Sequence, residues 1–118
     1  MQSQIELQFQ DIKDKPQAKI VKFIGDLDAT NVEYVVEKIL GLMNRDINYI
    51  IADFEKLRYV NSTGLGILLH FSKTAKGKKG CFKITNVNEN VYEIIEIIGA
   101  TTLLEIFDEL KDAIHSLQ

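Results

Sequence analysis

Hydroxyl side chains and glycines gather in the segment 59–66, which carries the clearest chemical signal in the chain. Ser62 and Thr63 follow an apolar run that predicts a buried strand. They precede a stretch whose apolar residues recur at three and four positions, which predicts an amphipathic helix. Ser62 is therefore expected to be the N-cap of this helix, beside free backbone N–H groups and the positive end of the helix dipole. Such a turn can expose a group for modification or binding.

Two glycines, Gly64 and Gly66, follow these hydroxyls in the first helical turn. Each costs a helix roughly 1 kcal/mol relative to Ala, which indicates that something approaches the helix start closely. The approaching group could be a neighbouring strand of the same chain or a partner protein, and the residues alone leave both open. The segment lacks the third glycine of a dinucleotide fingerprint and the Lys of a phosphate-binding loop, so it favours packing over nucleotide binding.

Other residue types that could do chemistry form no convincing site. Ser62 and His70 are eight residues apart, roughly 12 Å along a helix, which is too far for a hydrogen bond. The pair Asp26 and Asp28 is too small a carboxylate set to define a calcium or magnesium loop. Cys81 is the only cysteine, which excludes an internal disulfide and a zinc site built from several thiolates. We therefore expect no enzyme activity, no metal and no cofactor.

The composition is that of an ordinary globular domain. The 118 residues are enough for about one domain, which we place at 1–118, and 46% of them are hydrophobic. A formal net charge of -3 argues against direct binding to nucleic acid. No signal peptide and no run of ~20 apolar residues is evident, so we expect no membrane insertion. The single cysteine fits a reducing cytoplasm.

Alternating strand and helix patterns surround the hydroxyl turn. The first two strands are expected to pair in antiparallel fashion, and the turn at 25–28 is expected to break the second. Later strands alternate with helices, which predicts right-handed crossovers and an α/β fold with a mostly parallel, mixed sheet. The expected strands are 5–9, 20–24, 49–54, 81–85 and 103–107, and the expected helices run from a cap at Thr30 or Asn31 to Asn44, then 62–76, 88–98 and 108–116.

Several of these segments together resemble a known family. The Gly-Asp-Leu-Asp turn at 25–28, the strand at 50–54, the Asn-Ser-Thr-Gly-Leu-Gly turn at 61–66, and the later segments 84–87 and 97–99 fall in one order. In that order and spacing the chain resembles the STAS family, and specifically bacterial anti-sigma factor antagonists. The resemblance spans nearly the whole chain. It implies the STAS-type fold, a mixed and mostly parallel sheet with helices packed mainly on one face.

The resemblance also implies a function. Members of this group are non-catalytic partner-switching regulators of transcription, which bind an anti-sigma factor and so free a sigma factor. The anti-sigma factor is often a serine kinase, which inactivates the antagonist by phosphorylating one serine, and a serine phosphatase reverses the modification. That serine corresponds to Ser62, with Thr63 as the second candidate acceptor. The partner-binding residues implied are Asp26, Asp28, Asn61, Ser62, Thr63, Gly64 and Leu65.

Asn61 departs from the family pattern, which usually has Asp at this position. Asn keeps the size and the hydrogen bonding of Asp but not its charge, so we expect it to blunt phosphorylation without abolishing binding. Two other functions remain open on the same resemblance: a ligand-binding module of an anion-transport complex, and a scaffold subunit of a sensory complex. A neighbouring gene for a serine kinase of the anti-sigma type would favour the antagonist role, whereas one for a transporter would favour the transport role.

Overall fold

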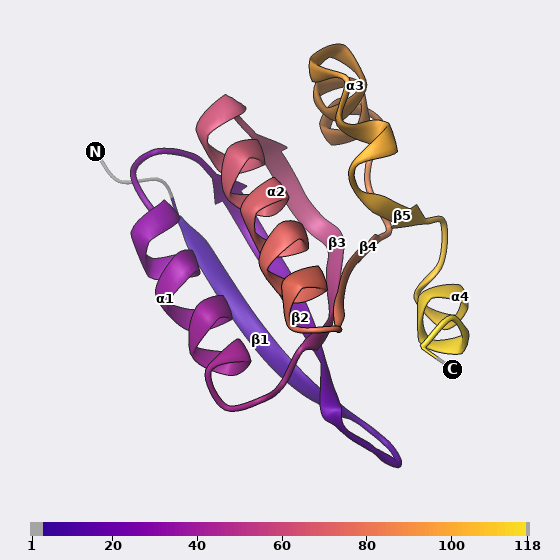
Figure 1. The fold of residues 1–118 in the computed structure, drawn as a ribbon. Helices are drawn as coiled ribbons and strands as arrows, with labels where there is room; N and C mark the ends of the chain where they lie inside the picture. The colour runs from indigo at the N-terminus through magenta and orange to yellow at the C-terminus, as the bar shows by residue number, and fades with distance from the viewer. Residues whose placement is uncertain (1–3, 118) are drawn as a thin grey trace.

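The computed structural model describes residues 4–117, and a five-stranded sheet in the order β1-β2-β3-β4-β5 forms its centre. β1 pairs with β2 in antiparallel fashion, and the other three pairs are parallel (Figure 1). This is the mixed, mostly parallel sheet that the alternating sequence pattern predicts. The strands are β1 Ile5–Ile12, β2 Lys15–Leu27, β3 Tyr49–Val60, β4 Cys81–Thr85 and β5 Glu105–Phe107.

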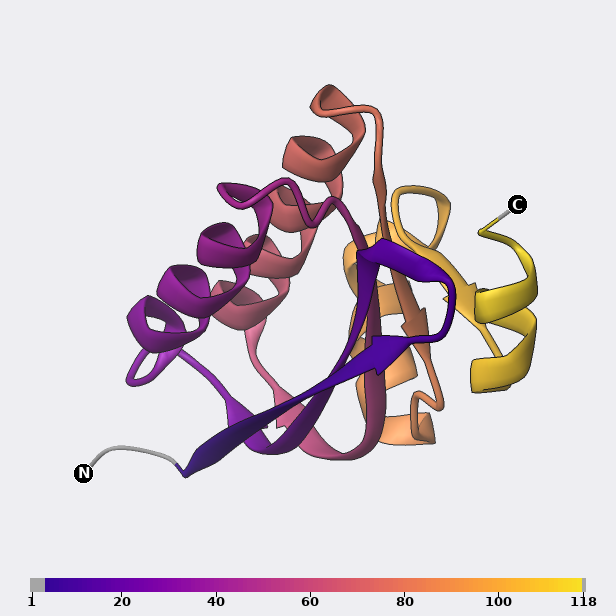
Figure 2. The ribbon, with the colours of Figure 1, turned by 90° about the horizontal axis from the view of Figure 1, so that it is seen from below.

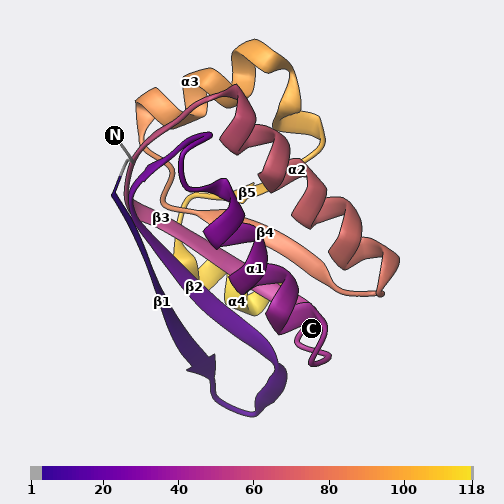
Figure 3. The same ribbon diagram turned by 90° about the vertical axis from the view of Figure 1, so that its left-hand side faces the viewer.

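Helices cover the two faces of this sheet unequally. The helices are α1 Val32–Met43, α2 Ser62–Gly77, α3 Glu89–Ile98 and α4 Leu110–His115, with a short 3-10 helix η1 at Ala100–Thr102. The larger core joins α1, α2 and α3 to one face of the sheet, whereas α4 packs on the opposite face. Figures 2 and 3 show the sheet between α1 and α2 on one side and α4 on the other. The expected packing of helices mainly on one face is therefore confirmed.

Strand alternation explains why both faces are apolar near the middle of the sheet. Val21 and Phe23 of β2 point into the larger core, while Ile20, which directly precedes Val21, points the other way. Ile20 packs with Ile51 of β3 and Ala113 of α4. Because successive side chains of a strand point to opposite faces, a continuous apolar run marks a strand that is covered on both sides.

Five strand boundaries differ from the sequence-based expectation. β1 continues to Ile12 and β2 already begins at Lys15, so both strands extend further into their hairpin than expected. β2 does not break at Gly25, since Gly25 adopts a φ of +117° and the Asp26 N–H donates to the Gln4 carbonyl at 3.0 Å. The prediction of a break there is wrong because the glycine conformation lets the strand continue. β3 continues to Val60, which pairs with Leu27. β5 is shorter than expected because Leu103 and Leu104 belong to the turn that follows η1, where both backbone N–H groups donate to the Ala100 carbonyl.

Candidate functional site

The hydroxyl turn connects the end of β3 to the start of α2. Asn61 has extended backbone geometry, with φ −95° and ψ −177°, and its Oδ1 accepts the N–H of Gly64 at 2.9 Å. Asn61 is therefore the N-cap of α2, and the expectation that Ser62 caps the helix is wrong. Ser62 is instead the first helical residue, and Ser62 and Thr63 are both exposed. The capping role of Asn61 leaves the Ser62 hydroxyl outside the cap.

Gly64 and Leu65 lie beneath this turn. Leu65 is only 1% exposed, and a Cβ on Gly64 would lie 2.8 Å from the Leu27 carbonyl oxygen and 2.8 Å from Cγ2 of Val60. The close neighbour of Gly64 is therefore this chain's own strands. Both residues are among the partner-binding residues predicted from the sequence, and the structure places them beneath the turn, where they support it. Gly66 is exposed, with no atom within 4 Å of a built Cβ, so packing does not explain it.

The end of β2 brings a second turn beside the first. Leu27 pairs with Val60 across the sheet, and its carbonyl accepts the N–H of Asn61 at 3.2 Å. Asp26 and Asp28, which flank Leu27 in the sequence, are thereby placed next to the turn that carries Ser62. Two segments more than 30 residues apart thus meet at the carboxyl ends of two parallel strands, the edge at which α/β sheets commonly bind their ligands.

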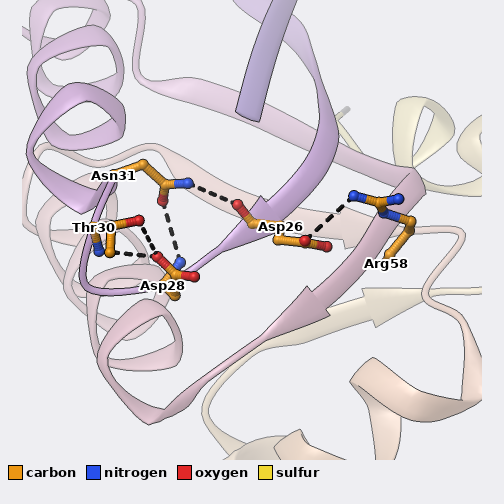
Figure 4. A network of polar contacts seen from close by, with 5 residues as sticks. All are labelled: Asp26, Asp28, Thr30, Asn31 and Arg58. Atoms are coloured by element: carbon orange, nitrogen blue, oxygen red, sulfur yellow. Dashed lines mark hydrogen bonds and ion pairs between the residues drawn. The ribbon is translucent and has the colours of Figure 1, made fainter. Parts of the chain in front are cut away.

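Hydrogen bonds hold this second turn in shape (Figure 4). The Asp28 carboxylate accepts from the backbone N–H of Thr30 at 2.9 Å and from its hydroxyl at 2.6 Å. Asn31, which is 2% exposed, accepts from the Asp28 N–H at 3.2 Å and donates to the Asp26 carbonyl at 2.8 Å. Asn31 therefore binds back to the turn in place of capping α1 with its side chain. The Asp28 carboxylate has a structural role in addition to any role at the surface.

The Asp26 carboxylate points toward β3, where the Arg58 guanidinium lies 3.3 Å away (Figure 4). Tyr59, which pairs with Asp26 across the two strands, is 48% exposed. Sequence reasoning assigned no role to Arg58 or Tyr59, because β3 was expected to end at Phe54. Only the pairing of the extended β3 with the end of β2 places an arginine and a tyrosine at the edge of this site.

Other chemical candidates lie apart from the turn. Cys81 is buried in β4, and burial raises the pKa of its thiol, which keeps the sulfur in its unreactive protonated form. Within residues 4–117, no three His, Cys, Asp or Glu side chains gather to hold a metal ion. In the same part of the chain, every helix is too short or too polar to span a membrane.

The sequence of this chain is similar to those of known proteins. The chain is 25% identical over 100 residues to an anti-sigma F factor antagonist of Paenibacillus polymyxa, covering 84% of this chain and 86% of that protein. It is 25% identical over 96 residues to an anti-sigma-B factor antagonist of Bacillus subtilis (strain 168), covering 81% of this chain and 87% of the relative. The curated relatives thus match along most of their length.

Solved structures share the whole fold. The anti-sigma factor antagonist SpoIIAA in its unphosphorylated form superposes with a TM-score of 0.78 at 21% identity, covering 94% of this chain and 95% of that one. SpoIIAA of Bacillus in its phosphorylated form has a TM-score of 0.71 at 20% identity, covering 96% of this chain and 100% of that one. The family model for the STAS domain matches residues 10–113. From this match and this fold, the chain belongs to the STAS domain family.

Proposed function

We propose that this chain is an anti-sigma factor antagonist that works by binding, without catalysis, as a single cytoplasmic STAS domain. The observation that carries the proposal is the meeting of the two turns at one end of the sheet, where Asp26 and the exposed Ser62 and Thr63 lie together. The names of its relatives favour this role. We define the switch face as Asp26, Asp28, Asn61, Ser62 and Thr63.

Ser62 is the proposed phosphoacceptor on this face, with Thr63 as the lesser candidate. Ser62 begins the 16-residue helix α2, whose first turn contains no acidic residue. A phosphate there would add about −1.5 to −2 charge next to the positive end of the helix dipole, which stabilises the modified residue. The modification should therefore change the switch face and leave the fold intact. A serine kinase of the anti-sigma type and a serine phosphatase are the expected partners in this cycle.

Affinity purification from the native cell, followed by calorimetry with the purified partner, tests the binding role. The expected result is a complex with a serine kinase that regulates a sigma factor, and loss of that complex when the switch face is altered. Recovery of transporter subunits alone, with no sigma-regulatory protein, would contradict the proposal. That outcome would favour a role in an anion-transport complex.

Charge reversal of Asp26 is expected to weaken the partner complex at least about tenfold, or ~1.4 kcal/mol, with little change in thermal stability. The Asp26–Arg58 pair is 3.3 Å long and its arginine is 72% exposed, and such surface pairs contribute about 0–1 kcal/mol to folding. The matched control is Asp11→Lys, which breaks the ion pair with Lys19 near the opposite end of β2. Calorimetry and thermal melts of both variants give the result. If the Asp26 variant and the wild type bind the partner with equal affinity, Asp26 is not part of the switch face.

The Asn61→Asp variant is expected to be phosphorylated faster at Ser62 than the wild type. An Asp oxygen can accept the Gly64 N–H as Asn61 does, so the cap should persist while a charge is added beside the acceptor. Affinity of the unmodified protein should change by less than about tenfold. Kinase assays compare it with Asn90→Asp, which adds the same charge to the exposed surface of α3. Equal rates in all three proteins would show that the charge at this position is irrelevant.

A further inference from the structure

Exposed apolar side chains gather where α3 ends and η1 follows. Ile97 is 74% exposed, Ile98 is 48% exposed and Leu103 is 56% exposed, although they lie within seven residues of one another. Single apolar residues on a surface need no explanation, but a contiguous group of large ones marks an interaction site. α3 and η1, beside which this group lies, pack on the same face of the sheet as α1 and α2.

One side of this apolar group is basic. Leu103 lines a surface hollow of about 320 Å³ together with Leu69, Ser72, Lys73 and Lys76 of α2. The Ser72 hydroxyl donates to the Leu103 carbonyl at 3.4 Å, which keeps this loop against α2. Lys73 and Lys76 are exposed, so their ammonium groups border the hollow.

The other side is acidic. Ile97 lines a second hollow of about 610 Å³, which also contains four carboxylates and the half-exposed ring of Tyr92. No lysine or arginine is among the residues that line this hollow. Its acidic residues are Glu89, Glu93, Glu96 and Asp108.

The basic side, the apolar centre and the acidic side follow one another in this order, which makes the surface complementary to a second copy of itself. We propose that a second copy of this chain binds here, forming a closed dimer through what we call the α2–α3 face: Leu69, Lys73, Lys76, Glu93, Glu96, Ile97, Ile98 and Leu103. A two-fold axis through the apolar group places the lysines of one copy against the glutamates of the other, twice over. The apolar side chains then form the buried centre of the contact, and the charges at its rim set the register.

The α2–α3 face is separate from the switch face. Lys73 lies eleven residues beyond Ser62 on the same helix, which is about 16 Å along its axis. A dimer of this kind therefore leaves both copies of Ser62 accessible. Dimerisation through this face does not require the anti-sigma factor, so the purified chain is sufficient to measure it.

Sedimentation analysis of charge variants over a concentration series tests the dimer. The wild-type chain is expected to dimerise as concentration rises. The double variant Lys73→Glu/Lys76→Glu has an all-acidic face and is expected to stay monomeric, as is Glu93→Lys/Glu96→Lys with an all-basic face. An equimolar mixture of the two should form a one-to-one dimer, because both pairs of contacts become complementary again.

Further variants separate this result from a general effect of charge or misfolding. Lys13→Glu/Lys15→Glu changes the net charge equally, within the hairpin of β1 and β2, and should dimerise as the wild type does. Leu103→Ser, which alters only the apolar centre, should raise the dimer Kd at least about tenfold. Circular dichroism confirms that each variant is folded. A wild-type chain that stays monomeric, a mixture that fails to associate, or growth beyond a dimer would each overturn the proposal.

Discussion

The protein phosphorylated at Ser62 is expected to bind the anti-sigma factor at least about 100-fold more weakly than the unmodified protein, a loss of ~2.8 kcal/mol in binding free energy. The phosphate would bring nearly two negative charges to an exposed position on the switch face, beside the turn that carries the Asp26 and Asp28 carboxylates. A partner surface shaped for the neutral hydroxyl must then desolvate that charge. Calorimetry on the modified and unmodified protein measures the loss, and thermal melts should show that both remain folded.

Three variants isolate this effect. Ser62→Ala should bind its partner and take up no phosphate, and Thr63→Ala should still be modified at Ser62. Ser62→Asp should reduce affinity only partly, since a carboxylate carries less charge and fewer acceptor oxygens than a phosphate. Mass spectrometry locates the modification after incubation with the kinase and ATP. Undiminished phosphate on Ser62→Ala protein would show that the acceptor is another residue.

The overall architecture could be predicted from local patterns because each strand carries its own burial signal. Continuous apolar runs such as Ile50 to Phe54 predict a strand covered on both faces, and the structure places Ile50 and Ile51 in the two separate cores. The lengths of the strands were harder to predict. β3 runs past Phe54 because it pairs with the end of β2. The segment after Phe54 mixes charged and apolar residues and lacks the continuous apolar run that marks the first half of the strand.

The N-cap of α2 shows a second limit of prediction from the sequence. Asn61 and Ser62 are adjacent, and both residue types are strong N-caps, so propensity cannot choose between them. The choice follows from the extended backbone of Asn61, which the hydrogen bond from its N–H to the Leu27 carbonyl fixes. That contact joins residues far apart in the sequence. The position of the hydroxyl turn was thus predictable, whereas the role of each residue within it required the three-dimensional contact.

Gly64 and Gly66 look equivalent in the sequence, but substitutions at the two positions are expected to have opposite effects. Contact with the end of β2 governs the effect at Gly64, whereas helix propensity alone governs it at Gly66. Gly64→Ala is expected to lower the free energy of unfolding by about 1–3 kcal/mol, since the new Cβ would lie 2.8 Å from the Leu27 oxygen. Gly66→Ala meets nothing within 4 Å and should instead raise it by up to ~1 kcal/mol through helix propensity. Urea denaturation of the two variants measures both changes.

The same pair links packing to function. Leu27 also holds the N–H of Asn61, so a Cβ at Gly64 that displaces the Leu27 carbonyl should shift the N-cap and the Ser62 beside it. Partner affinity is therefore expected to fall in Gly64→Ala and to stay unchanged in Gly66→Ala. If both substitutions stabilise the protein equally, the end of β2 can yield to a methyl group without cost, and the close packing of Gly64 does not hold the switch face in position.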